Sequence, residues 1–185
     1  MEKMKIIKKS LIDGCMLFEH PRFSDERGNF IKIFSDPLLM KYLKKKKIKQ
    51  VNYSTTKKKY SIRGLHYQNP YPEFKLVKCL EGKIFDVVVD LRKDSKTFMK
   101  HQIFDLNSKK SHILLIPENC AHGYQTLESN CKILYMHTND YFPKYSKGFN
   151  YNDPLFKIKW PAKAKNISKK DLSYSLVDKI KFKGY

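Results

Sequence analysis

Arginine is scarce in this sequence. The chain carries 38 lysine and arginine residues against 18 aspartate and glutamate residues, which gives a formal net charge of +20. A charge of this size suggests nucleic-acid binding. Nearly all of the excess is lysine, however, and the only arginines are Arg22, Arg27, Arg63 and Arg92. Proteins that contact bases or phosphates in a bidentate way use the guanidinium group. We therefore interpret the charge as a biased surface composition, and a basic nucleic-acid-binding protein remains the less favoured alternative.

Long hydrophobic runs are also missing. The opening segment MEKMKIIKKSLIDG has no apolar stretch of the length that a secretory signal needs. No later window approaches the ~20 apolar residues of a membrane-spanning helix. We expect a soluble, cytoplasmic protein that does not contact a membrane.

The cysteines do not form a metal or disulfide pattern. Cys15, Cys79, Cys120 and Cys131 are scattered, with no C-x-x-C pair and no histidine at metal-ligand spacing. Neither a zinc site nor a disulfide framework is predicted. We expect four buried free thiols.

The sequence does contain enough apolar material for a folded domain. Its 185 residues are 41% hydrophobic and 14% aromatic, which is sufficient for a sizeable core. No internal repeat or low-complexity linker marks a boundary. We expect one domain over residues 1–185.

Alternation of apolar and polar residues predicts strands between about 50 and 142. In 83–91, apolar residues alternate with a face that carries Asp86 and Asp90, the pattern of a half-buried strand. The other strand-like runs are 75–80, 101–106, 112–116 and 131–137. Short strands at this spacing, separated by turn signals, favour a mostly β, antiparallel sandwich or barrel.

Two short helices are predicted outside the strand region. Ser35-Asp36-Pro37 is typical of a capped helix start, and the run 44–47 of lysines then falls at the helix end, where cations are favourable. Over 168–181, Ser168 and Asp171 fit a capping box. Leu172, Leu176 and Ile180 would form one apolar face behind it.

A cluster of polar residues lies within the predicted strands. It comprises 63–68 (Arg-Gly-Leu-His-Tyr-Gln), then Lys75, 119–124 and Tyr135. Burying such groups without partners is costly, so a ligand pocket would explain them. Each also has a local explanation. His66 and His122 can be structural histidines, Tyr135 fits a core position, and Asp171 has a capping role.

The polar cluster and its flanking segments resemble the nucleotide-sugar 3,5-epimerases, the family typified by dTDP-4-dehydrorhamnose 3,5-epimerase. The resemblance covers roughly residues 12 to 172, with the blocks in order and at family spacing. The matching blocks are Asp25-Glu26-Arg27-Gly28, Gln50-x-Asn52, Arg63-Gly64-Leu65-His66-Tyr67-Gln68, Lys75-Leu76-Val77, Phe85-Asp86-Val87-x-Val89-Asp90-Leu91-Arg92, Ile116-Pro117-x5-Gly123 with His122, Leu134-Tyr135, Asn152-Asp153-Pro154 and Trp160-Pro161.

The resemblance implies a cupin-type jelly roll with short peripheral helices, its core at about 50–142. It also implies a homodimer that exchanges an N-terminal strand, and no cofactor. Many cupins bind metal through an H-x-H pair, but His66 is followed by Tyr67-Gln68 and His122 lies far along the chain. We therefore expect no metal.

The implied activity is 3- and/or 5-epimerisation of a nucleotide-linked 4-keto-6-deoxy sugar, hexose or heptose, for surface polysaccharide synthesis. By resemblance, His66 is the base and Asp171 its carboxylate partner. Lys75 faces the C4 oxygen, and Tyr135 reprotonates the sugar from the other side. The substrate-binding residues implied are Arg27, Lys32, Gln50, Asn52, Arg63, His122 and Tyr141.

Two lysines depart from the family pattern. Lys32 and Lys144 stand where relatives that use dTDP-sugars commonly carry acidic residues. A carboxylate accepts a hydrogen bond from thymine N3, whereas a lysine can only donate. A GDP-linked sugar is therefore a second substrate hypothesis, unless Lys32 belongs to the general lysine bias. A keto-isomerase on the same fold is a further alternative, which the presence of both His66 and Tyr135 disfavours.

Overall fold

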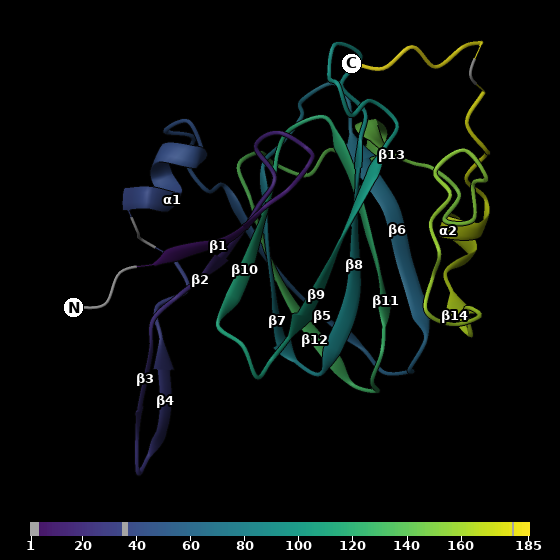
Figure 1. Cartoon of the computed structure of the whole chain (residues 1–185). Coiled ribbons are helices and arrows are strands. Elements are labelled where there is room, and N and C mark those ends of the chain that lie inside the picture. The colour runs from purple at the N-terminus through teal and green to yellow at the C-terminus, as the bar shows by residue number, and fades with distance from the viewer. Residues whose placement is uncertain (1–3, 35–36, 179) are drawn as a thin grey trace.

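The computed structural model describes residues 4–34, 37–178 and 180–185. Its strands form two large antiparallel sheets that face each other, together with a separate two-stranded hairpin (Figure 1). The fold is the mostly β sandwich of cupin type that the sequence predicts.

The first sheet contains both N-terminal strands and four strands of the predicted core. Its order is β1 (Lys5–Lys9), β2 (Met16–Glu19), β10 (His112–Ile116), β7 (Lys75–Glu81), β12 (Cys131–His137) and β5 (Gln50–Thr56). Every neighbouring pair is antiparallel.

The second sheet is built around three long central strands. Its order is β13 (Ser146–Gly148), β6 (Ser61–Gln68), β11 (Cys120–Thr126), β8 (Lys83–Asp90) and β9 (His101–Asn107), with β14 (Asn166–Ile167) pairing parallel to β6. In Figure 1 the C-terminal segment that carries β14 runs beside β6. This placement brings residues around 170 next to the strand that contains His66.

The apolar core lies between the sheets and on both of their outer faces. Val77, Leu114 and Ile133 of the first sheet pack against Val88 and Tyr124 of the second. The helix α1 (Pro37–Tyr42) covers the outer face of the first sheet. The segment after β13 covers the second. All four cysteines are buried free thiols, as predicted.

The predicted strands are confirmed, with one correction to β8. Its residues alternate as expected, but Asp86 and Asp90 are as fully buried as the apolar set. The strand is therefore not half-buried. The C-terminal segment covers its apolar face, and the sandwich interior encloses the two carboxylates, where Asp86 has a histidine partner.

The helices are shorter than predicted. Pro37 begins α1 as expected, whereas Ser35 and Asp36, the predicted cap, lie outside the described residues. The helix predicted over 168–181 is wrong beyond its first turn, because α2 spans only Lys169–Leu172, and the described residues after it form no helix.

The chain leaves the helical path after α2 because its backbone groups find other partners. Asn150 N donates to the carbonyl of Ser175, and Val177 N donates to the Asp153 carboxylate. Leu172, Leu176 and Ile180, expected to form one apolar face, are instead exposed. A third short helix, η1, spans Pro143–Tyr145.

A two-stranded hairpin projects away from both sheets. It consists of β3 (Arg22–Asp25) and β4 (Gly28–Ile31), and Figure 1 shows it extending from the end of the first sheet. Phe23 and Phe30 face each other across the hairpin and are 48% and 65% exposed. A ribbon with this much exposed aromatic surface lacks a core of its own.

Strands β6 and β11 approach unusually closely at Gly64. Its φ is +113°, and a Cβ there would lie 2.5 Å from the Gly123 Cα and 2.6 Å from the His122 carbonyl oxygen. Only glycine fits such a backbone position. The close approach sets the spacing between the strands that carry His66 and His122.

Among the described residues, no helix is long and apolar enough to span a membrane.

Candidate active site

A cavity of about 520 Å³ lies between the two sheets and is partly open to solvent. Polar side chains from β5, β7 and β12 line it on one side, and those from β6 and β11 line it on the other. Residues of α2 and the segment before it close its rim. It gathers eight of the predicted site residues: Asn52, Arg63, His66, Lys75, His122, Tyr135, Tyr141 and Asp171.

His66 and Asp171 form a hydrogen-bonded pair across the cavity wall. His66 Nε2 lies 2.6 Å from Asp171 Oδ1, and the histidine side chain is 41% exposed to the cavity, whereas the carboxylate is buried. A proton on Nε2 donated to the carboxylate leaves the lone pair on Nδ1. The pair therefore presents a histidine with a fixed tautomer, suited to accept a proton.

Asp171 also belongs to the helix start predicted from the sequence. Its backbone N–H donates to the Ser168 hydroxyl at 2.9 Å, so the cap is confirmed. Its side chain, however, is turned toward His66 and the Gly64 N–H. Burial opposes ionisation of the carboxyl group, but the hydrogen bond and charge of His66 outweigh it and hold the pKa of Asp171 below its usual value.

A second histidine–carboxylate pair lies one strand away. His122 is the cross-strand partner of His66, and its Nε2 lies 2.8 Å from Asp86 Oδ2. Both side chains are almost completely buried. The Asp86 contact fixes the orientation of the His122 ring at the cavity floor.

Lys75 enters the cavity from β7. Its Nζ lies 3.4 Å from the His66 carbonyl oxygen and 3.4 Å from Glu73 Oε1. The lysine side chain is almost entirely buried, so its charge acts at short range on whatever occupies the cavity.

Tyr135 faces the cavity from the sheet opposite His66. Its hydroxyl lies 3.3 Å from Ser54 Oγ, and its ring meets the His122 ring edge to face at 6.4 Å. Burial raises the pKa of the Tyr135 hydroxyl well above its usual value, so the group carries its proton at neutral pH. Its ring also packs against the core, the role that the sequence alone would assign to it.

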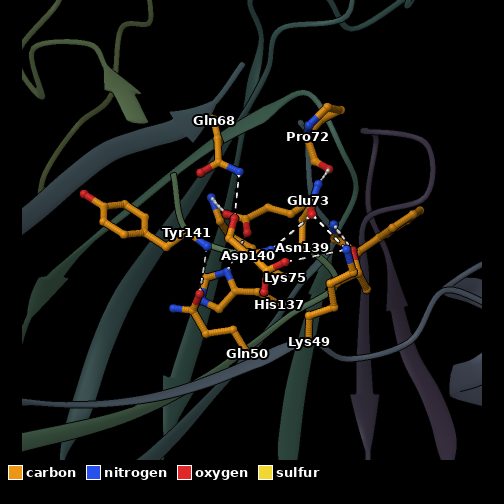
Figure 2. A network of polar contacts seen from close by, with 12 residues as sticks. Lys49, Gln50, Gln68, Pro72, Glu73, Lys75, His137, Asn139, Asp140 and Tyr141 are labelled. Atoms are coloured by element: carbon orange, nitrogen blue, oxygen red, sulfur yellow. Dashed lines mark hydrogen bonds and ion pairs between the residues drawn. The ribbon is translucent and has the colours of Figure 1, made fainter. Parts of the chain in front are cut away.

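Other predicted residues lie near opposite ends of β5. Arg63 Nε donates to the Thr56 hydroxyl at 3.0 Å. Gln50 lines an adjoining cavity of about 340 Å³ together with Asn52 and Tyr141. Its Oε1 accepts a 2.9 Å hydrogen bond from the Tyr141 N–H, a contact visible in Figure 2.

Two predicted binding residues lie outside the cavity. Arg27 sits at the tip of the β3–β4 hairpin, where its guanidinium pairs with Asp25 at 2.6 Å. Lys32 follows β4 and is exposed. The structure of one chain therefore does not bring these two residues to the site. Lys144 is exposed as well and lies over the Tyr145 ring.

Sequence reasoning missed several residues that line or support the site. Glu73 and His137 both line the cavity, and the Tyr174 ring meets His66 edge to face at 5.9 Å. Glu73 lies two residues before Lys75, and Asp86 was noted only for its strand face. Their pairing with histidines depends on strand registers that the sequence pattern does not give.

Across the described residues, no group of three or more histidine, cysteine, aspartate or glutamate side chains is arranged to hold a metal ion.

Comparison with known proteins decides the family. The family model described as dTDP-4-dehydrorhamnose 3,5-epimerase matches residues 9–179. The chain is 35% identical over 177 residues to the dTDP-4-dehydrorhamnose 3,5-epimerase of Methanothermobacter thermautotrophicus, covering 94% of this chain and 95% of that one. It is 36% identical over 172 residues to the protein of the same name from Shigella flexneri, covering 92% and 94%.

The chain belongs to the dTDP-4-dehydrorhamnose 3,5-epimerase family. It is therefore an enzyme of the isomerase class.

Solved structures of this epimerase family share the fold. A Legionella pneumophila dTDP-6-deoxy-D-glucose-3,5-epimerase in complex with dTDP-4-keto-L-rhamnose matches with a TM-score of 0.88 and 33% identity, covering 94% of this chain and 92% of that one. A Bacillus anthracis dTDP-4-dehydrorhamnose 3,5-epimerase with TDP and PPi bound matches with a TM-score of 0.89 and 34% identity, covering 94% and 99%.

The lowered pKa of Asp171 makes a prediction about acid stability. A carboxyl group whose pKa is lower in the folded chain stabilises the fold above its unfolded value, about 3.9, and loses that contribution as the pH falls through the folded value. We expect the stability difference between wild type and Asp171→Asn to shrink as the pH falls below about 4. Urea denaturation at a series of pH values measures it.

The control for Asp171 is Asp94→Asn, which changes an exposed carboxylate in the same way. Its unfolding free energy should follow that of wild type across the series. An Asp171→Asn curve that stays parallel to wild type throughout acid would contradict the prediction.

Proposed function

We propose that this chain is a cofactor-independent 3- and/or 5-epimerase of a dTDP-linked 4-keto-6-deoxy hexose. The observation that carries the proposal is the arrangement of two groups in one cavity. A histidine with a carboxylate partner faces it from one sheet, and a protonated tyrosine faces it from the other. Inversion at carbon requires a base and an acid on opposite faces of the sugar.

The chemistry is proton abstraction next to a ketone. The 4-keto group acidifies the hydrogens at C3 and C5, and His66 Nδ1 accepts one of them. The C–H electron pair forms the enolate, and the charge develops on the C4 oxygen. Asp171 stabilises the imidazolium that results, as a buried carboxylate does in other catalytic dyads. Tyr135 then donates its proton to the carbon from the other face.

The remaining cavity residues suit the charge that develops. Lys75 brings a buried ammonium group next to His66, and we assign it to the C4 oxygen. Arg63, which lines the cavity, suits a phosphate or the enolate. His122, held by Asp86, would donate to the sugar or orient it. Asn52, Gln50 and Tyr141 line the adjoining cavity, which we assign to the rest of the nucleotide.

The relatives support dTDP as the carrier. The Legionella and Bacillus structures named above hold dTDP-4-keto-L-rhamnose and TDP, and the Methanothermobacter and Shigella relatives are named for dTDP-4-dehydrorhamnose. The GDP-linked alternative is based on Lys32 and Lys144, which both lie outside the cavity of the chain. We therefore place dTDP first and keep GDP as an outcome of the test.

The competing hypotheses have less support. A keto-isomerase that shifts the carbonyl group would not need the protonated Tyr135 on the opposite sheet. A nucleic-acid-binding protein would not need a histidine–aspartate pair in a cavity between the sheets. We further propose that residues 1–185 form one epimerase domain, working in the cytoplasm and supplying sugars for surface polysaccharide.

Solvent exchange tests the proposed function. We expect wild-type protein in deuterated water to introduce deuterium at C3, C5 or both of a dTDP-4-keto-6-deoxy hexose, as followed by NMR. His66→Ala should abolish exchange while leaving dTDP affinity within about three-fold, because the base acts on the transition state rather than on nucleotide binding.

The outcomes separate the hypotheses. Parallel incubation with a GDP-linked 4-keto sugar tests the second carrier. Absence of label with either sugar would refute the epimerase proposal. Deuterium in the GDP-linked sugar alone would assign GDP, in place of dTDP, as the nucleotide of the substrate. Normal exchange in His66→Ala would show that another residue is the base.

Tyr135→Phe separates exchange from inversion. Phenylalanine keeps the ring that packs in the core but removes the proton that the acid supplies. We expect this variant to retain exchange through His66 with retention of configuration, while epimerised product falls by at least ~100-fold. The stereochemistry of the labelled product, by NMR, measures both. Normal inversion would leave Tyr135 with a packing role only.

We also propose a homodimer in which N-terminal strands are exchanged. The projecting β3–β4 hairpin carries Arg27 and Lys32 away from the cavity of its own chain and leaves Phe23 and Phe30 exposed. A second copy would cover these rings and could receive Arg27 at its own site. The hairpin is therefore the segment through which we expect the exchange.

Sedimentation equilibrium tests the dimer. We expect wild-type protein to be dimeric and Phe30→Ser to weaken the dimer by at least ~10-fold in dissociation constant, because the ring loses its apolar cover. Leu176→Ser is the matched control, an exposed apolar residue on the opposite C-terminal segment. A monomeric wild type, or equal dimerisation of Phe30→Ser and wild type, would refute the hairpin interface.

A further inference from the structure

A buried ion-pair network lies beside Lys75, and the proposed chemistry does not use it. Glu73 lies between a lysine and a histidine: its Oε1 lies 3.4 Å from Lys75 Nζ, and its Oε2 lies 3.1 Å from His137 Nδ1. Figure 2 shows the three side chains within one network of polar contacts. All three line the main cavity, so the network faces the site and not the protein surface.

The three groups are nearly shielded from water. Their side chains are 9% (Lys75), 11% (Glu73) and 13% (His137) exposed. In such surroundings an ion pair interacts strongly, and a charge left without a partner is costly. Burial opposes ionisation of Glu73, but the contact with His137 and the charge of Lys75 outweigh it and hold the pKa of Glu73 below its usual value. Glu73 is therefore an anion at the pH of the reaction.

The contacts of Lys75 fix the direction of its ammonium group. An ammonium group has three N–H donors. One faces the His66 carbonyl oxygen and another faces Glu73, both at 3.4 Å. The third is left for the cavity. With Glu73 neutral or displaced, the flexible four-carbon chain of the lysine would have only the weaker carbonyl contact to hold it.

The Glu73 carboxylate is itself held in place from two sides. His137 contacts its second oxygen and so opposes rotation of the carboxylate away from Lys75. The backbone of the loop is tied to the strand that carries His137. Phe74 N donates to the Thr138 hydroxyl at 2.9 Å, and Thr138 N donates to the Phe74 carbonyl at 3.2 Å. The loop, β12 and the head of β7 therefore form one rigid unit around Lys75.

We infer that Glu73, held by His137, is a positioning residue that aims the Lys75 ammonium group at the C4 oxygen of the sugar. The inference rests on the proposed function, since it assigns Glu73 a part in the same reaction. Glu73 touches no reacting atom and acts only through Lys75. The competing explanation is structural, in which Glu73 and His137 merely tie the loop to β12.

A double-mutant cycle separates the two explanations. We expect Glu73→Gln to lower kcat for deuterium exchange by about ten-fold and to change KM by less than about three-fold, because ground-state binding of the nucleotide does not involve it. Lys75→Met should lower kcat further. In the Lys75→Met background, Glu73→Gln should have no further effect, since the group that it positions is gone.

Glu81→Gln is the matched control. It removes a carboxylate from an ion pair with Lys132, 2.7 Å long, at the opposite end of β7 and away from the cavity. We expect its kcat to equal that of wild type. If Glu73→Gln fails to fold, His137→Gln takes its place in the cycle. We expect a several-fold loss of kcat from that variant alone and none in the Lys75→Met background.

The outcomes distinguish this inference from the proposed function. No exchange by the wild type would refute the proposed function itself. With an active wild type, a Glu73→Gln rate equal to wild type would overturn the inference alone. The inference would also be overturned if the losses of kcat from Glu73→Gln and Lys75→Met multiplied in the double variant, because a purely structural role predicts independent effects.

Discussion

The hydrogen bond between His66 and Asp171 is the constraint on which the rest of the site depends. It joins residues 105 positions apart, one on a central strand and one on a single turn of helix. For the bond to form, the C-terminal segment must lie against β6, and the short β14 pairs with that strand in parallel to hold it there. The glycine pair Gly64 and Gly123 lets β6 and β11 approach closely just behind the histidine. The path of the segment after β13 therefore depends on the contacts with β6 and His66 as well as on packing in the core.

The sandwich interior is divided between apolar and polar ends. At one end, aliphatic and cysteine side chains of both sheets pack together. At the other end, the inward-facing positions of the same strands carry histidines, a lysine and a tyrosine. The polar groups there are paired within the chain: Asp171 with His66, Asp86 with His122, and Glu73 with Lys75. These pairs offset the desolvation cost and leave the charged groups oriented toward the cavity.

The alternation of residues predicts the strands well, because it is a short-range pattern, whereas most of the predicted site residues come from the resemblance to a known family. The alternation in 75–81, 83–90 and 131–137 places Lys75 and Tyr135 on inward faces once the sandwich closes. The same local reasoning fails for the helix predicted over 168–181, which ends after one turn. Its apolar spacing is that of a helix, yet the turn at Asn150–Asp153 offers its backbone better partners. The pairing of Glu73 with His137 depends on the contact between a loop and a strand 64 residues away, which no local pattern encodes.

The position of Asp171 in the chain has a consequence for biosynthesis. Ribosomes release a chain from its N-terminal end, so every strand of the two large sheets emerges before residue 171 does. A nascent sandwich can bury its aliphatic core at that stage, but its His66 ring still lacks the carboxylate that orients it. The pairing of His66 with Asp171 is therefore completed last, when the C-terminal segment docks against β6 of the sandwich.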